Sequence, residues 1–221
     1  MRIGKALGIL MAGWFLLAGM PLLGQDETEG MLNNLARNFD KLDRFSVDAT
    51  IKVEVDFIKI KDRLVKIKFE KPDKFSFESD GLALLPKNGL QLEYLSLIQK
   101  GYTSLPAGQE DLEGVRTHII KVIPESDTED IILAQMWIDP VANRILKMKT
   151  YTKKSGSYVI EFKYGKTPFN LPDQTTVNFD ISALTIPAKV MSEFHPQGGK
   201  VKEGPSQAKV TILYTNYKIN Q

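Results

Sequence analysis

The sequence predicts an α+β fold in which one large, curved antiparallel sheet is accompanied by few helices. The clearest evidence is the segment 45–57, where seven apolar residues at odd positions alternate with six polar residues. This alternation is typical of a strand with one dry and one wet face. Such strands belong to antiparallel sheets, because parallel strands are usually buried on both faces. Only two stretches after residue 24 have the spacing of a helix instead.

Residues 1–24 have the layout of a secretory signal peptide. Arg2 and Lys5 form a positive start, an apolar stretch follows at 6–23, and an acidic run comes next at 26–29. An uncleaved membrane anchor is the alternative, because the apolar stretch is about 18 residues long. We expect cleavage, which leaves 25–221 as a single exported domain, since neither a linker nor a repeat divides it.

Composition excludes several classes of function. The chain contains no cysteine, and therefore has no disulfide framework, thiolate metal site or cysteine nucleophile. Loss of the two cations of the signal peptide lowers Lys+Arg from 29 to 27, which equals the 27 Asp and Glu residues. The mature chain is then formally neutral and lacks the basic surface that nucleic-acid binding requires.

The first element expected after the signal peptide is a helix. The acidic run before it suits the positive end of a helix dipole. Its apolar side follows helical spacing, through Met31, Leu32, Leu35, Ala36, Phe39 and Leu42.

The strands are expected in order along the rest of the chain. After the long strand come alternating runs at 65–69, 75–77, 146–149, 158–164, 177–181 and 209–215. Turn signals stand at 71–74, 139–143 and 154–156, and a long loop is expected at 195–206. Together they predict roughly nine to eleven strands.

Two segments depart from simple alternation. Residues 131–138 are apolar at both odd and even positions, so we expect both faces of this strand to be covered. The segment 88–100 predicts a short helix, with Asn88 as its cap and Gly101 at its end.

A one-sided sheet must cover its apolar face, and these helices are short for that purpose. A 13-residue strand spans about 40 Å, whereas a 15-residue helix spans only about 22 Å. The uncovered part of a curved sheet would form an apolar trough, and exposed apolar area of that size usually marks a binding site. The alternative is a sandwich or closed barrel whose apolar face is entirely packed.

The order of motifs resembles a known family. A short helix leads through 42–50 into the long strand, the turn region 71–77 follows, and 136–140, 145–149 and 158–162 come later. This order resembles the LolA/LolB-type periplasmic lipoprotein carriers and the wider outer-membrane lipoprotein-sorting proteins. Residues 81–86 depart from the pattern, because they replace a longer Gly-x-x-Leu-Trp-x-Tyr-like run of the family.

The resemblance implies an incomplete, strongly curved antiparallel β-barrel with helices as a lid over an apolar cavity. It implies a periplasmic, non-enzymatic carrier or sensor that binds lipid or lipoprotein acyl chains without a cofactor. A membrane-bound donor or acceptor protein would be its partner. The alternative is a structural or protein-interaction module without a ligand.

Alternation along the strands selects the residues expected to line the cavity, and the apolar stripe of the segment 88–100 selects those expected in the lid. The lining residues are Val53, Val55, Phe69, Phe75, Phe77, Leu146, Met148, Ile160 and Phe162. The lid residues are Leu90, Tyr94, Leu97 and Ile98.

Signals for catalysis or metal binding are weak. His118 and His195 are the two histidines, and neither belongs to a catalytic motif. The acidic run at 125–130 lacks the spacing of a calcium loop and is interpreted as a solvated hairpin tip. Trp137 is interpreted as a core residue, with a stacking platform as the alternative. A glycosidase-type hydrolase stays open as a third hypothesis, because paired carboxylates meet only in the fold.

Overall fold

The computed structural model describes residues 24–55, 58–59, 61–72, 74–78, 97–98, 101–125, 130–153, 156–180 and 207–220. Residues 1–23 of the expected signal peptide, the segment 81–86 and the loop 195–206 lie outside these residues, as does most of the helix expected at 88–100. The division into a signal peptide at 1–24 and one domain at 25–221 stays a prediction.

The described residues form one long helix, one short 3₁₀ helix and eleven strands. In chain order these are α1 (Gln25–Phe39), β1 (Arg44–Val55), β2 (Ile58–Lys59), β3 (Arg63–Glu70), β4 (Lys74–Glu78), β5 (Tyr102–Leu112), β6 (Val115–Pro124), β7 (Ile131–Asp139), β8 (Arg144–Thr152), β9 (Ser157–Lys163), η1 (Pro168–Asn170), β10 (Gln174–Asp180) and β11 (Gln207–Ile219). The count agrees with the number of strands that alternation predicts.

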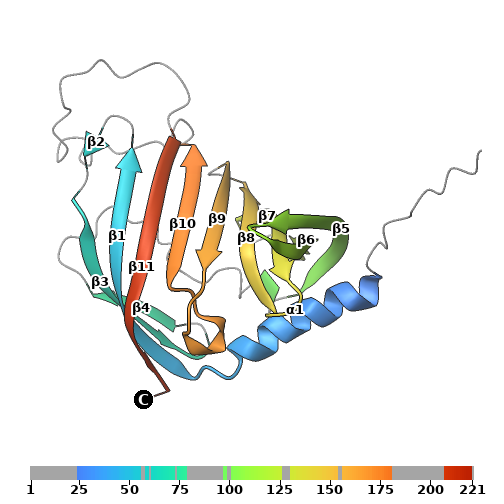
Figure 1. Ribbon diagram of the computed structural model, residues 1–221, viewed down its shortest axis with the longest axis horizontal. Coiled ribbons are helices and arrows are strands. Elements are labelled where there is room, and N and C mark those ends of the chain that lie inside the picture. Colours follow the sequence, from blue (N-terminus) through green and yellow to red (C-terminus); the bar gives the residue numbers. More distant parts are fainter. Residues whose placement is uncertain are drawn as a thin grey trace, which may run out of the picture.

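The strands form a single antiparallel sheet in the order β4-β3-β1-β11-β10-β9-β8-β7-β6-β5, with β2 paired to β1 beside this path. Strands β5 to β10 meander, whereas β11 returns to lie between β10 and β1. The edge strands β4 and β5 do not pair with each other, so the sheet is open. In Figure 1 the strands turn from nearly upright at β1 and β11 to nearly horizontal at β5 and β6. This strong curvature confirms the predicted α+β fold class.

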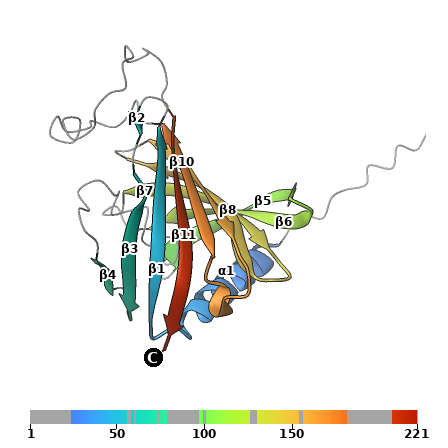
Figure 2. The same cartoon turned by 60° about the vertical axis from the view of Figure 1, so that its left-hand side comes forward.

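Helix α1 begins earlier than apolar spacing predicts, and the acidic residues Asp26 and Glu27 lie in its first turn. Thr28 extends the buried stripe of Leu32, Leu35 and Phe39 by one turn, and this polar member hid the true start. The helix contacts β5 and η1, and the Phe39 ring lies 5.0 Å from that of Phe69 in β3. Thus α1 crosses the inner face of the sheet, and Figure 2 shows it beneath the strands. No described helix combines the length and the apolarity that a membrane crossing demands.

The core lies on the face that the odd residues of β1 share. Val47, Ala49 and Ile51 are buried there, and their neighbours on β3 are Val65 and Ile67. The segment 131–138 is covered on both faces only in its second half, where Met136, Trp137 and Ile138 are all buried. At its start Ile132 remains 47% exposed.

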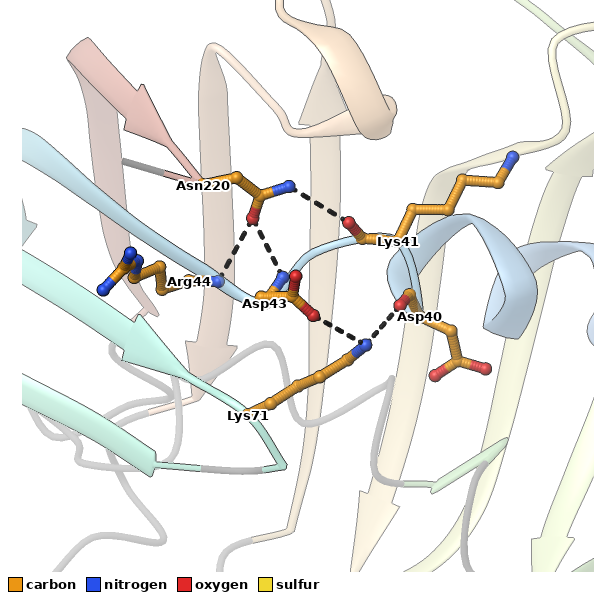
Figure 3. A network of polar contacts seen from close by, with 6 residues as sticks. All are labelled: Asp40, Lys41, Asp43, Arg44, Lys71 and Asn220. Carbon is orange, nitrogen blue, oxygen red and sulfur yellow. Dashed lines mark hydrogen bonds and ion pairs between the residues drawn. The ribbon is translucent and has the colours of Figure 1, made fainter.

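A polar network joins the C-terminal strand to the turn between α1 and β1 (Figure 3). The Asn220 Oδ1 atom accepts hydrogen bonds from the backbone N–H groups of Asp43, at 2.9 Å, and Arg44, at 3.3 Å. Its Nδ2 atom donates to the Lys41 carbonyl at 3.2 Å. From the turn between β3 and β4, Lys71 donates to the Asp40 carbonyl and to the Asp43 carboxylate. Three separate chain segments are therefore held together where α1 ends.

Candidate ligand-binding face of the sheet

The inner face of the sheet consists of rows of residues that lie side by side across the strands. One row crosses eight strands, from β1 to β5, and consists of Val53, Val210, Val177, Ile160, Met148, Met136, Ile120 and Pro106. Three predicted lining residues, Val53, Met148 and Ile160, stand in this one row. Antiparallel register thus aligns residues from strands that are distant in the sequence.

The next row lies one step closer to the end of β1 and is less covered. It consists of Val55, Ala208, Phe179, Tyr158, Thr150, Ala134, Val122 and Ser104. Val55, Phe179 and Tyr158 are only half-buried. We call this part of the inner face, made by Val53, Val55, Tyr158 and Phe179, the far end.

The opposite part of the inner face lies under α1, and we call it the covered end. Here the Phe69 ring is surrounded by three others, with ring centroids 5.0 Å away at Phe39, 5.3 Å at Phe45 and 4.9 Å at Phe75. Such tilted and offset pairs are the favourable geometries of aromatic rings. Phe69 is 2% exposed, so the covered end is closed core.

The predicted lining residues divide between these surroundings. Phe69, Met148, Ile160 and Phe162 are buried members of the core. Val53 and Val55 are half-buried at the far end, and Phe75 and Phe77 are half-buried in the edge strand β4.

Leu146 lies at an irregularity of the sheet. The pairing of β7 with β8 shifts by one residue there, so that Trp137 faces Lys147 while Ile138 faces Ile145. This β-bulge makes Leu146 the extra, half-buried residue, and Ile145 takes the buried place beside Ile138. Simple alternation has no means of showing where a bulge occurs.

Two of the four predicted lid residues fall within the described chain. Leu97 and Ile98 are helical and buried against the core. Leu90 and Tyr94 lie outside the described residues.

Tyr158 and Phe179 were not among the predicted lining residues, although both occupy the alternating positions of their strands. The pattern contained the signal, but it gave no reason to choose the ends of β9 and β10. Neither β9 nor β10 is among the elements that α1 mainly contacts, which are β5 and η1.

Polar atoms interrupt the apolar face. The buried hydroxyls of Ser104, Thr150 and Thr175 have no hydrogen-bond partner within the described part of the protein. Burial raises the pKa of the nearby Tyr214 to about 12. The inner face is thus apolar in the main, with hydroxyl groups spaced along it.

A cavity of about 30 Å³ lies between α1 and the sheet, lined by Leu35, Phe39, Ile145, Tyr164 and Phe169 among others. That volume suits a water molecule and is far too small for an acyl chain. A long ligand on the inner face would therefore have to use the far end or displace α1.

Trp137 and His118, the residues considered for stacking or catalysis, contact neighbouring side chains of the sheet. Trp137 is buried, its indole N–H donates to the Glu110 carboxylate, and the Lys147 ammonium lies 4.6 Å from its ring centroid. His118 lies in β6 with Nε2 3.3 Å from the Gln109 amide nitrogen. Among the described residues, His, Asp and Glu side chains form no group that would hold a metal ion.

No family model matches this sequence. No curated protein matches it either. Solved structures do share the fold. A domain described as an outer membrane lipoprotein-sorting protein, from Vibrio parahaemolyticus, has a TM-score of 0.61 at 12% identity, over 89% of this chain and 93% of the other.

Two further structures show the same likeness. A DUF1329 family protein from Desulfovibrio piger ATCC 29098 has a TM-score of 0.59 at 12% identity, over 88% of this chain and 92% of the other. A LolA superfamily protein from Nitrosomonas europaea has a TM-score of 0.56 at 8% identity, over 88% and 94%. The resemblance noted in the sequence is therefore confirmed at the level of the fold.

Proposed function

We propose that this chain is an exported, non-enzymatic carrier or sensor that binds lipid or acyl chains against the far end of the inner face. The observation that carries the proposal is the half-buried apolar group Val53, Val55, Tyr158 and Phe179 at the end of an otherwise packed sheet. The shared fold with a LolA superfamily protein and a lipoprotein-sorting domain supports the same reading.

Binding would be driven by the removal of apolar surface from water. Each methylene of an acyl chain contributes about 0.8 kcal/mol when it is fully buried. The acyl chain would first contact the far end, and the inner face beneath α1 would provide further apolar area. Deep binding would then couple to a displacement of α1, whose main contacts are with β5, η1 and the Phe69 cluster.

The location and the partners belong to the same proposal. A cleavable signal peptide at 1–24 would bring the chain to the periplasm, where a membrane-bound donor or acceptor protein would exchange the acyl chain with it. Hand-off to such a partner is required because a deeply buried chain leaves slowly by itself.

The first test is to purify the mature chain, extract it with organic solvent and identify co-purifying fatty acid or phospholipid by mass spectrometry. The delipidated chain is then titrated with dansyl-labelled undecanoic acid. We expect Phe179→Ala to weaken the binding of this probe about ten-fold, because half a phenyl group of contact area is lost.

Tyr151→Ala is the matched control, because Tyr151 is also a half-buried aromatic residue but lies on the outer face of β8. Equal losses in the two variants would contradict the inner face as the binding surface. No bound lipid and no probe binding would favour the alternative, a protein-interaction module with a packed sheet.

A further inference from the structure

A groove of about 520 Å³ lies where β1, β3, β4 and β11 come together. Its lining residues with charged or hydroxyl side chains are Arg44, Ser46, Lys68, Glu70, Lys74, Ser76 and Lys218, and Phe45, Phe69 and Phe75 also border it. The charged and hydroxyl-bearing residues occupy positions that alternate with Phe45, Phe69 and Phe75, so they belong to the outer face of the sheet. The groove is thus separated from the proposed lipid-binding face by the thickness of the sheet.

Register explains how the groove forms. One cross-strand row consists of Arg44, Glu70 and Lys74, and the adjacent row consists of Lys218, Ser46, Lys68 and Ser76. The two serines are short side chains between long cationic ones. They therefore form a hydroxyl-bearing floor, and the lysines and the arginine form its walls.

The groove has an excess of positive charge. Four cations line it against one carboxylate, Glu70. A second carboxylate outside the lining, Glu78, forms an ion pair with Lys68, and this contact lowers the pKa of Glu78. Among the residues that the structure describes, the side chains of Arg44, Lys74 and Lys218 form no ion pair. An excess of two charges remains, on a mature chain that is formally neutral as a whole.

These features match the chemistry of a phosphate group. A phosphate monoester carries close to two negative charges at neutral pH and several strong acceptor oxygens. An arginine guanidinium binds such oxygens in a bidentate manner, and the serine hydroxyls supply neutral donors. The volume of the groove is within the range of small-molecule sites, about 300–1,000 Å³.

We propose that this outer groove is a binding site for phosphate-bearing anions, with Arg44, Lys74 and Lys218 as the main ligands and Ser46 and Ser76 as hydroxyl donors. The phosphate has two sources, a soluble phosphate ester or the headgroup of an anionic phospholipid. The site is independent of lipid binding on the inner face.

Two probes distinguish these sources with the mature chain. Glycerol 3-phosphate is titrated by calorimetry at 50 mM and 200 mM salt, and vesicles of phosphatidylcholine with 30% phosphatidylglycerol are used in flotation. We expect the triple variant Arg44→Gln, Lys74→Gln, Lys218→Gln to weaken binding about five-fold for each charge removed, or about 100-fold in total. Binding of the soluble ester identifies that source, and binding of the vesicles alone identifies the headgroup.

The matched control is Lys52→Gln, Lys66→Gln, Lys209→Gln. It removes the same charge from the outer face of β1, β3 and β11, but each lysine is paired with a carboxylate and lies outside the groove. The proposal is overturned if both triple variants lose binding equally, or if neither probe binds the wild-type chain. Phe179→Ala should leave phosphate binding unchanged, so failure of the lipid-binding proposal is detected separately.

Discussion

The two ends of β1 have the same alternation of residues but different surroundings. At the covered end Phe45, Val47 and Ile51 are buried, whereas Val53 and Val55 at the far end are half-buried. Helix α1, the ring of Phe39 and the Asn220 network all lie at the covered end. The comparison teaches that alternation in a strand identifies the apolar face, whereas the neighbouring elements decide how much of that face is filled.

The largest effect is expected from Phe69→Ala at the centre of the covered end. The substitution leaves a cavity among three aromatic rings, so the free energy of unfolding should fall by about 3–5 kcal/mol. Urea denaturation followed by circular dichroism measures this change. Phe77→Ala, in the adjacent edge strand, is the control and should lower the free energy of unfolding clearly less, because Phe77 is half-buried.

A closer comparison uses the same substitution at the two ends of β1. Val47→Ala, at a side chain 2% exposed, should lower the free energy of unfolding by about 2 kcal/mol. Val55→Ala should lower it by about 1 kcal/mol or less, since its side chain already contacts water. Equal losses, measured by urea denaturation, would show that the far end is as closely packed as the covered end.

The sequence was sufficient for the fold class, because alternation in β1, β3, β9, β10 and β11 is regular enough to reveal antiparallel strands. It was less informative about the site. Leu146 and Met148 both stand at even positions of β8, yet a β-bulge in the pairing of β7 with β8 leaves Leu146 half-buried and Met148 buried. Burial by α1 also depends on where the helix lies, which local spacing does not specify.

The phosphate groove was invisible to sequence reasoning for a related reason. Arg44, Lys74 and Lys218 come from three strands, and only the pairing of β11 with β1, of β1 with β3 and of β3 with β4 brings them together. Each residue alone is an ordinary charged residue on the wet side of a strand. The register of the sheet, rather than any motif, creates this constellation.

The third prediction concerns the network that fixes the covered end. Asn220→Ala removes two accepted hydrogen bonds and one donated bond, and it places alanine at a residue with φ 52°. The free energy of unfolding should fall by about 1–2 kcal/mol. Asn220→Gly separates the causes, because glycine tolerates the positive φ and loses only the side-chain hydrogen bonds. If both variants match the wild-type chain in urea denaturation, the network does not stabilise the covered end.

The smallest effect on stability is expected from the ionisation of Tyr214, which lies between the two ends and pairs with Ala49 across β11 and β1. Although part of this residue is exposed, burial of its hydroxyl raises the pKa from its ordinary value of 10 to about 12. The unfolded chain therefore loses this proton near pH 10 while the folded chain keeps it. Stability is unaffected below pH 10 and falls as the pH rises from 10 towards 12, by up to about 1 kcal/mol at pH 11.

Tyr214→Phe tests this dependence, because phenylalanine keeps the ring and removes the titrating group. The difference in free energy of unfolding between wild type and variant should be constant from pH 7 to pH 9, and should then shift in favour of the variant by pH 11. Urea denaturation at these pH values measures it, with Tyr151→Phe on the outer face as the control. A constant difference up to pH 11 would mean that the Tyr214 hydroxyl is as well hydrated as the hydroxyl of an exposed tyrosine. The less covered part of the inner face would then extend further towards α1 than the burial of Ile51 and Ile212 indicates.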